Sequence, residues 1–195
     1  MYYNIFIMMY LTTSFTNAFL FKFPPLDEEN NGLNKEAKNT SINYYSNNMD
    51  PLNGMSLDIF VALFKLFSPI HKMNDSDIAN KFFDEVQNDE FMALERFLKI
   101  MTEFVIITED ELTTTYKEYL NQDGKMTKKE FEELVKGFNS NITADIFTNI
   151  ITENCTDAQN ISFPEFRVIA VEFYYKLLES LKVKLYHEEG IYLKL

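Results

Sequence analysis

The stretch NQDGKMTKKEF, residues 121–131, is the part of the chain from which the fold can be inferred. Side chains with oxygen atoms precede a single glycine, Gly124, and the apolar Met126 follows it. Residues Thr127 to Glu130 match a capping box, in which the threonine accepts a backbone N–H and the glutamate reaches back. A short polar loop that leads directly into a helix is therefore predicted here.

Apolar residues recur at helical spacing on both sides of this loop. The predicted exit helix has one apolar face, formed by Phe131, Leu134, Val135 and Phe138. A second capping box, Thr108 to Glu111, predicts the start of the entering helix, whose apolar face is Leu112, Tyr116, Tyr119 and Leu120. A polar loop between two amphipathic helices has the geometry of a helix–loop–helix cation site.

This arrangement resembles an EF-hand. With Glu130 as the twelfth and bidentate residue of the loop, Gly124 falls sixth, where the turn requires glycine. The resemblance implies calcium ligands at Asn121, Asp123, Lys125 (through its carbonyl), Thr127 and Glu130. The first place holds Tyr119, a phenol instead of a carboxylate. In a second possible register the loop starts at Asn121 and lacks two residues.

Length and composition fit a folded acidic protein of one or two small domains. The chain has 195 residues, of which 46% are hydrophobic and 15% aromatic. The formal net charge of −12 argues against a nucleic-acid partner. Beyond the N-terminus, no segment approaches the 18 or so continuous apolar residues of a membrane span.

The first 18 residues contain no charged side chain, and residues 5–11 form a run of bulky apolar side chains. Thr16, Asn17 and Ala18 then supply the small residues of a cleavage site. Residues 1–18 are therefore predicted to be a signal peptide, and the protein to be secreted or to lie in the secretory lumen. The alternative is a buried N-terminal helix. Residues 19–54, rich in asparagine and proline, are predicted to be a tether of low order.

From residue 55 the sequence repeats with a period near 35 residues, which is typical of stacked supersecondary units. Met126 has counterparts 35 residues away at Ile161 and Phe91, and Glu130 has counterparts at Glu165 and Glu95. One further step back, of 36 residues from Phe91, reaches Met55. Two more helix faces share the spacing of the one after Glu130: Phe60, Leu63, Phe64, Phe67 and Phe166, Ile169, Ala170, Phe173.

The other three loops depart from the ligand pattern. In the second, the helix face at Phe97 is displaced by one residue, so that either Glu95 or Arg96 occupies the closing place. In the fourth, Gln159 stands where glycine belongs, so this loop is expected to relax to another shape. In the first, Ile59 stands at the closing place, and the sequence gives no sign of an entering helix.

The last helix is predicted to run from Phe163 past Leu181, with an apolar stripe that continues through Tyr174. Such a stripe completes the core or covers a neighbouring unit, fills the protein's own peptide-binding groove, or binds a partner.

Residues 55–181 thus resemble the calmodulin-type EF-hand superfamily. The resemblance implies an all-α fold of about four paired helix–loop–helix units, the first two degenerate, with a long C-terminal helix. The pairs are expected at 55–105 and 106–195, with Met126 and Ile161 in an antiparallel contact between the third and fourth loops.

The resulting functional prediction is a secreted protein that binds calcium weakly through the third loop. The alternative is a calcium-independent interaction module on the same scaffold, with a protein or a peptide helix as partner. An enzyme is not expected, because His71 and His187 lie far apart and no phosphate loop or nucleophile elbow occurs.

Overall fold

The computed structural model describes residues 20–87, 89–136 and 144–189, and this part of the chain is all-helical, as predicted. Its helices are α2 (Lys35–Asn48), α3 (Leu57–Lys65), α4 (Ser68–His71), α5 (Asp75–Val86), α6 (Leu94–Glu118), α7 (Lys128–Lys136), α8 (Ala144–Asn154) and α9 (Phe163–Glu189). Only isolated β-bridges pair backbone segments within these ranges. The predicted signal peptide, residues 1–18, lies outside them. None of the described helices combines the length and apolar character that crossing a membrane requires.

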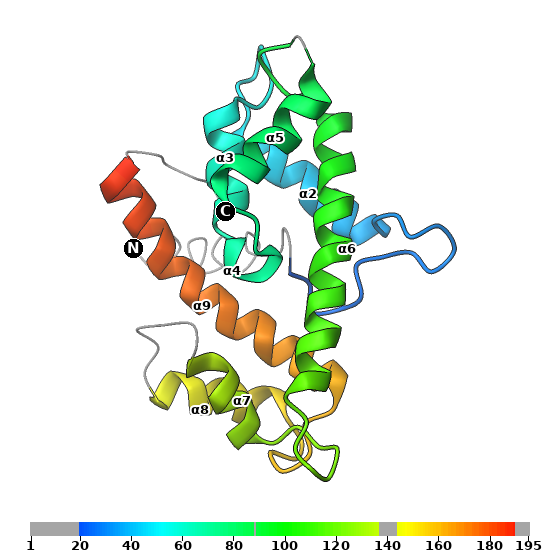
Figure 1. The fold of residues 1–195 in the computed structure, drawn as a ribbon, viewed down its shortest axis with the longest axis vertical. Helices are drawn as coiled ribbons and strands as arrows, with labels where there is room; N and C mark the ends of the chain where they lie inside the picture. The colour runs from blue at the N-terminus through cyan, green and yellow to red at the C-terminus, as the bar shows by residue number, and fades with distance from the viewer. Residues whose placement is uncertain (1–19, 88, 137–143, 190–195) are drawn as a thin grey trace, which may run out of the picture.

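Helix α6 extends along one side of the molecule from end to end (Figure 1). Helices α2, α3 and α5 lie beside its N-terminal half, whereas α7 and α8 lie at the opposite end of the molecule. Helix α9 starts at that opposite end and crosses the molecule obliquely, passing below α4 in this view. The two ends are therefore held together by two long helices.

Two β-bridges join the loops of consecutive helix–loop–helix units. Met55 pairs with Met92 and Met126 pairs with Ile161, both antiparallel. In the second bridge, the N–H of Ile161 donates to the carbonyl of Met126 at 2.8 Å. The predicted contact between Met126 and Ile161 is therefore present. The first bridge links the α2–α3 unit to the α5–α6 unit.

Residues 19–54, predicted to be a tether, instead contain an ordered helix, so that prediction is wrong. The side chain of Asn34 caps α2 by accepting the N–H of Ala37 at 2.9 Å. Buried positions then recur at helical spacing, at Ala37, Ser41, Tyr44 and Tyr45. Only a narrow stripe of a polar helix is buried, which explains why average composition concealed it. Helix α2 is the entering helix of the first unit.

The capping box at Thr108 does not start a helix, because α6 runs without interruption for 25 residues. Thr108 is only 2% exposed and lies on a continuous buried face: Phe97, Ile100, Met101, Phe104, Val105, Thr108 and Leu112. The apolar stripes of the two predicted helices are in phase, and no glycine or proline separates them. The expected boundary between residues 105 and 106 consequently lies inside one helix.

One contiguous core extends through both ends of the molecule. The apolar stripe of α9 contributes to it: the hydroxyl of Tyr174 donates to the carbonyl of Leu66 at 2.6 Å, and its ring stacks on Phe67. Helix α9 is the predicted long terminal helix. Its described stripe covers the neighbouring units and completes the core, which was the first of the alternatives for it.

Candidate functional site

The third loop, residues 119–127, forms a tight turn around the side chain of Asn121. Its amide oxygen accepts the N–H groups of Asp123 at 2.9 Å and Lys125 at 3.0 Å. Gly124 adopts a φ of +73°, the left-handed conformation that glycine enters without steric cost. The predicted glycine turn is therefore present, and it is held by an asparagine side chain.

Most of the oxygens predicted to bind calcium in this loop accept or donate internal hydrogen bonds. The carbonyl of Lys125 accepts the N–H of Asn121 at 2.9 Å. The carboxylate of Glu130 accepts both the hydroxyl of Thr127 and its N–H, the latter at 3.2 Å. The hydroxyl contact lowers the pKa of Glu130. Among the four residues predicted to bind through their side chains, Asp123 is exposed and the other three are half-buried. The structure thus brings the five residues into one loop but directs their oxygens mainly to one another.

The second loop, between α5 and α6, takes the register in which Arg96 occupies the closing place. Met92, not Phe91, pairs with Met55. Arg96 therefore follows the bridge residue by four positions, as Glu130 follows Met126 and Glu165 follows Ile161. Its guanidinium donates to the carbonyl of Val86 at 3.2 Å and to the carboxylate of Asp89 at 2.9 Å.

The fourth loop, residues 155–162, is closed by the carboxylate of Glu165. Ser162 donates to it through its hydroxyl at 2.7 Å and its N–H at 2.9 Å, and Thr156 does so at 2.6 Å and 2.8 Å. These hydrogen bonds, first those of Ser162 and then those of Thr156, lower the pKa of Glu165 to about 2. Gln159 stays out of the left-handed conformation, so the loop differs from a glycine-centred turn, as predicted.

The first loop, residues 49–56, is held by the side chain of Asp50. Its carboxylate accepts the N–H groups of Leu52 and Asn53, each at 2.9 Å. Gly54 has a φ of +111°, and a Cβ atom there would lie 2.7 Å from the carbonyl of Met92. The hydroxyl of Tyr45 donates to the same carbonyl at 2.7 Å. Helix α2 thereby fixes the bridge between the first two loops.

The residues of these loops do not fit a calcium ion well. Calcium takes six to eight oxygen ligands, several of them carboxylates. Across the described parts of the chain, no three acidic, histidine or cysteine side chains gather closely enough to hold a metal ion. A cation in the third loop would also have to replace the internal hydrogen bonds of Lys125, Thr127 and Glu130.

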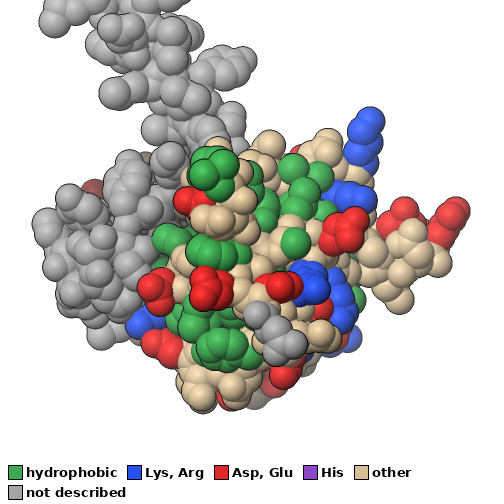
Figure 2. All heavy atoms as spheres, turned by 90° about the horizontal axis from the view of Figure 1, so that it is seen from above, with side chains coloured by type: hydrophobic (Ala, Val, Ile, Leu, Met, Phe, Trp, Pro, Cys, Tyr) green, Lys and Arg blue, Asp and Glu red, His purple; other side chains and the backbone are tan. Residues whose placement is uncertain are grey.

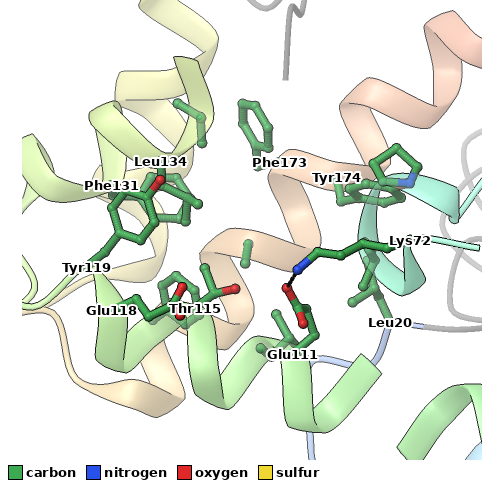
Figure 3. Close-up of a pocket in the computed structure, with 16 residues that line it drawn as sticks. Leu20, Lys72, Glu111, Thr115, Glu118, Tyr119, Phe131, Leu134, Phe173 and Tyr174 are labelled. Atoms are coloured by element: carbon green, nitrogen blue, oxygen red, sulfur yellow. Dashed lines mark hydrogen bonds and ion pairs between the residues drawn. The ribbon is translucent and has the colours of Figure 1, made fainter. Parts of the chain in front are cut away.

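A pocket of about 270 Å³ lies between α4, α6, α7 and α9 (Figure 3). Apolar side chains from distant parts of the chain line it: Leu20, Ile70, Leu112, Phe131, Leu134, Val135, Phe166, Ala170, Phe173 and Tyr174. Its volume is close to the lower end of the range for ligand sites, about 300–1,000 Å³. The pocket therefore suits a few apolar side chains better than a large cofactor.

Charged groups lie on one edge of this pocket. Lys72, which follows α4, forms an ion pair with Glu111 of α6, as the dashed line in Figure 3 marks. Glu118 lies two turns further along α6. Lys72 and Glu111 are held to each other at this edge, and apolar side chains make up most of the remaining lining.

A second apolar feature is less continuous. Leu52 is 92% exposed at the tip of the first loop, and Phe83 of α5 is 53% exposed. Figure 2, which views this end of the molecule, shows apolar side chains in separate groups with acidic side chains between them. The pocket is therefore the better candidate for a binding site.

The sequence did not indicate the pocket, although it contained part of the signal. Leu134 and Val135 belong to the predicted apolar face of the exit helix, yet both are only half-buried because that face lines the pocket. Phe138, the last residue of the stripe, lies outside the described residues. Leu20 and Ile70 reach the pocket only through tertiary packing.

Comparison of the chain with protein-family models, curated proteins and solved structures gave no match in any of the three.

Proposed function

We propose that this protein is a calcium-independent interaction module that receives an apolar segment of a partner protein, such as one face of a peptide helix, in the pocket between α4, α6, α7 and α9. The observation that carries the proposal is the pocket itself. Its apolar lining comes from four elements and is walled on one edge by the Lys72–Glu111 pair. In helix-in-groove recognition, an amphipathic helix lays its apolar face into an apolar groove of this kind.

Calcium independence is supported by the hydrogen bonds that hold the four loops. Asp50, Arg96, Asn121 and Glu165 each connect backbone or side-chain groups within or next to their own loop. A loop whose donors and acceptors are already paired gains less from an ion, because binding must first break those hydrogen bonds.

The test is a selection of helical peptides from a random display library against the full chain, in the presence of a calcium chelator. Selected peptides are then measured by calorimetry against wild type and against Ala170→Phe, which places a ring in the pocket. Ala79→Phe, a half-buried alanine on α5 outside the pocket lining, is the matched control. We expect Ala170→Phe to weaken binding at least about tenfold, a difference of about 1.4 kcal/mol.

The control variant should bind as wild type does, and the chelator should have no effect. Selected peptides that bind Ala170→Phe and wild type equally would contradict the proposed site. Binding that disappears in the chelator would contradict calcium independence.

Weak calcium binding by the third loop is the second candidate function. It is favoured by Gly124 in a left-handed turn and by the gathering of Asn121, Asp123, Thr127 and Glu130 in one loop. With two carboxylates, such a loop should bind calcium with a dissociation constant on the order of 10⁻⁴ M or weaker.

Calorimetry on wild type and Glu130→Gln tests this candidate, because that change removes the closing carboxylate and keeps its shape. Heat of binding that is present in wild type and lost in Glu130→Gln supports it. If wild type shows no heat of binding at millimolar calcium, calcium binding by the third loop is ruled out.

Secretion is proposed on the charge-free N-terminus and the small residues before Phe19. The first described residues are anchored: Leu20 is 1% exposed, and its carbonyl accepts the hydroxyl of Tyr175. N-terminal sequencing of the protein from its native source should begin at or near Phe19. Recovery of an intact Met1 on a cytosolic protein would contradict secretion.

A further inference from the structure

Arg96 connects three parts of the second helix–loop–helix unit. It belongs to the first turn of α6, its guanidinium donates to the carbonyl of Val86 at the end of α5, and the same nitrogen reaches Asp89 in the loop. The guanidinium therefore lies between the end of the entering helix and the start of the exit helix.

The place of Arg96 in the unit is set by backbone pairing. Met92 bridges Met55, and the residue four positions later closes the loop. In the third and fourth loops that residue is a glutamate, Glu130 or Glu165, which accepts hydrogen bonds from its own loop. In the second loop it is a cation that donates them. The closing residue of the second loop is therefore a donor of hydrogen bonds, whereas in the third and fourth loops it is an acceptor.

We infer that Arg96 is the built-in cation of the second loop: its guanidinium supplies the positive charge that joins the helix end to the loop carboxylate, and it excludes a divalent ion from that place. A guanidinium keeps its charge at every pH that a protein experiences. The C-terminal carbonyls of a helix carry partial negative charge, so a cation at Val86 is favourable. A metal ion beside this fixed charge would be repelled.

This inference goes beyond the proposed function, because it concerns the pairing of the first two units and needs no occupant in the pocket. Its readout is thermal unfolding of the chain alone. Failure of the peptide-binding experiment would leave it intact, and its own failure would leave the pocket intact.

The first test removes the charge. Arg96→Gln, measured in a chelator, should lower Tm by about 3–6 °C, since a hydrogen bond to a charged group and a helix-end contact are lost together. Lys99→Gln is the matched control: Lys99 lies one turn further along α6 and pairs with Glu85 at the surface. That control should lower Tm by about 2 °C or less. Equal decreases of Tm in Arg96→Gln and Lys99→Gln would overturn the inference.

The second test reverses the charge. Arg96→Glu puts a closing carboxylate four positions after Met92, at the place from which the guanidinium reaches Asp89. The unfolding temperature of this variant should be low in chelator and rise by roughly 2–5 °C in about 10 mM calcium. Wild type and Arg96→Gln should respond less than Arg96→Glu does.

Two outcomes would overturn the inference. One is an Arg96→Glu chain that is destabilised and that calcium does not rescue, since the guanidinium would then not occupy the place of a cation. The other is a calcium response of wild type as large as that of Arg96→Glu, since the guanidinium would then not exclude the ion. If Arg96→Glu fails to fold even in calcium, that counts as the first outcome.

Discussion

Arg167 of α9 and Glu109 of α6 form a bidentate ion pair, with nitrogen–oxygen distances of 2.6 Å and 2.5 Å. Their side chains are only 6% and 15% exposed, and the guanidinium also lies over the ring of Phe163 at 5.4 Å. Two parallel hydrogen bonds fix orientation as well as distance. The pair therefore sets how the two long helices that span the molecule lie against each other.

Replacing Arg167 by methionine should destabilise the protein strongly, because Glu109 would be left buried without its partner. We expect the free energy of unfolding, measured by urea titration, to fall by about 3–5 kcal/mol. The matched control is Lys136→Met, which breaks the exposed pair with Glu133 and should cost about 1 kcal/mol or less. If the free energy of unfolding fell no more in Arg167→Met than in Lys136→Met, the ion pair would not be what holds the two helices together.

Truncation of core phenylalanines should show that the two loop-exit helices are packed as described. Phe131 and Phe166 are each 1% exposed and lie with ring centroids 5.9 Å apart. Phe131→Ala and Phe166→Ala should each lower the free energy of unfolding by about 3–5 kcal/mol. Phe83→Ala, at a side chain that is 53% exposed, is the control and should cost less than about 1 kcal/mol. Costs below that level at both core sites would contradict the packing.

Stability should fall on mild acidification because of His71. Its Nδ1 accepts the N–H of Met73 at 3.0 Å, so Nε2 carries the proton and donates to the carbonyl of Phe64 at 2.9 Å. Burial lowers the pKa of His71 below its ordinary 6.5. The unfolded chain therefore binds the proton more readily, and the stabilising contribution, complete above pH 6.5, is lost as the pH falls toward the lower folded pKa.

The measurement for His71 is the free energy of unfolding at about pH 7.5 and about pH 5.5, a range in which unperturbed carboxylates stay charged. In His71→Gln, the difference between the free energies of unfolding at these two pH values should be smaller than in wild type. His187→Gln separates the contribution of the second histidine. An unchanged difference in His71→Gln would contradict the assignment.

A second loss of stability, at lower pH, should come from Glu165. Because the pKa of this carboxyl is lowered to about 2, the folded state holds it ionised where the unfolded chain binds a proton. Its stabilising contribution is complete above the ordinary value of 4.5 and is lost as the pH falls from there toward 2. Glu165→Gln should therefore flatten the decrease of Tm between about pH 5 and pH 2.5. Glu153→Gln, on the exposed face of α8, is the control and should leave the slope as in wild type.

The sequence by itself determined the helical class and most of the repeat. The apolar faces that begin at Phe60, Phe97 and Phe166 share one helical spacing, and these three residues are buried. The family resemblance that rests on this repeat implied the backbone contact between Met126 and Ile161, which is present. Such features are local or repeated, so a linear sequence carries them in full.

The tertiary structure decided the features that depend on contacts between residues far apart in the sequence. Helix α2 has a polar composition and was missed, because only its narrow buried stripe reveals it. The capping box at Thr108 does not start a helix, because a continuous buried face runs along α6 on both sides of it. The choice between Glu95 and Arg96 was open until Met92 paired with Met55, since register is fixed by the partner and not by the loop itself. The pocket combines Leu20 with residues of α7 and α9, more than 100 positions away, and no pattern in the sequence joins them.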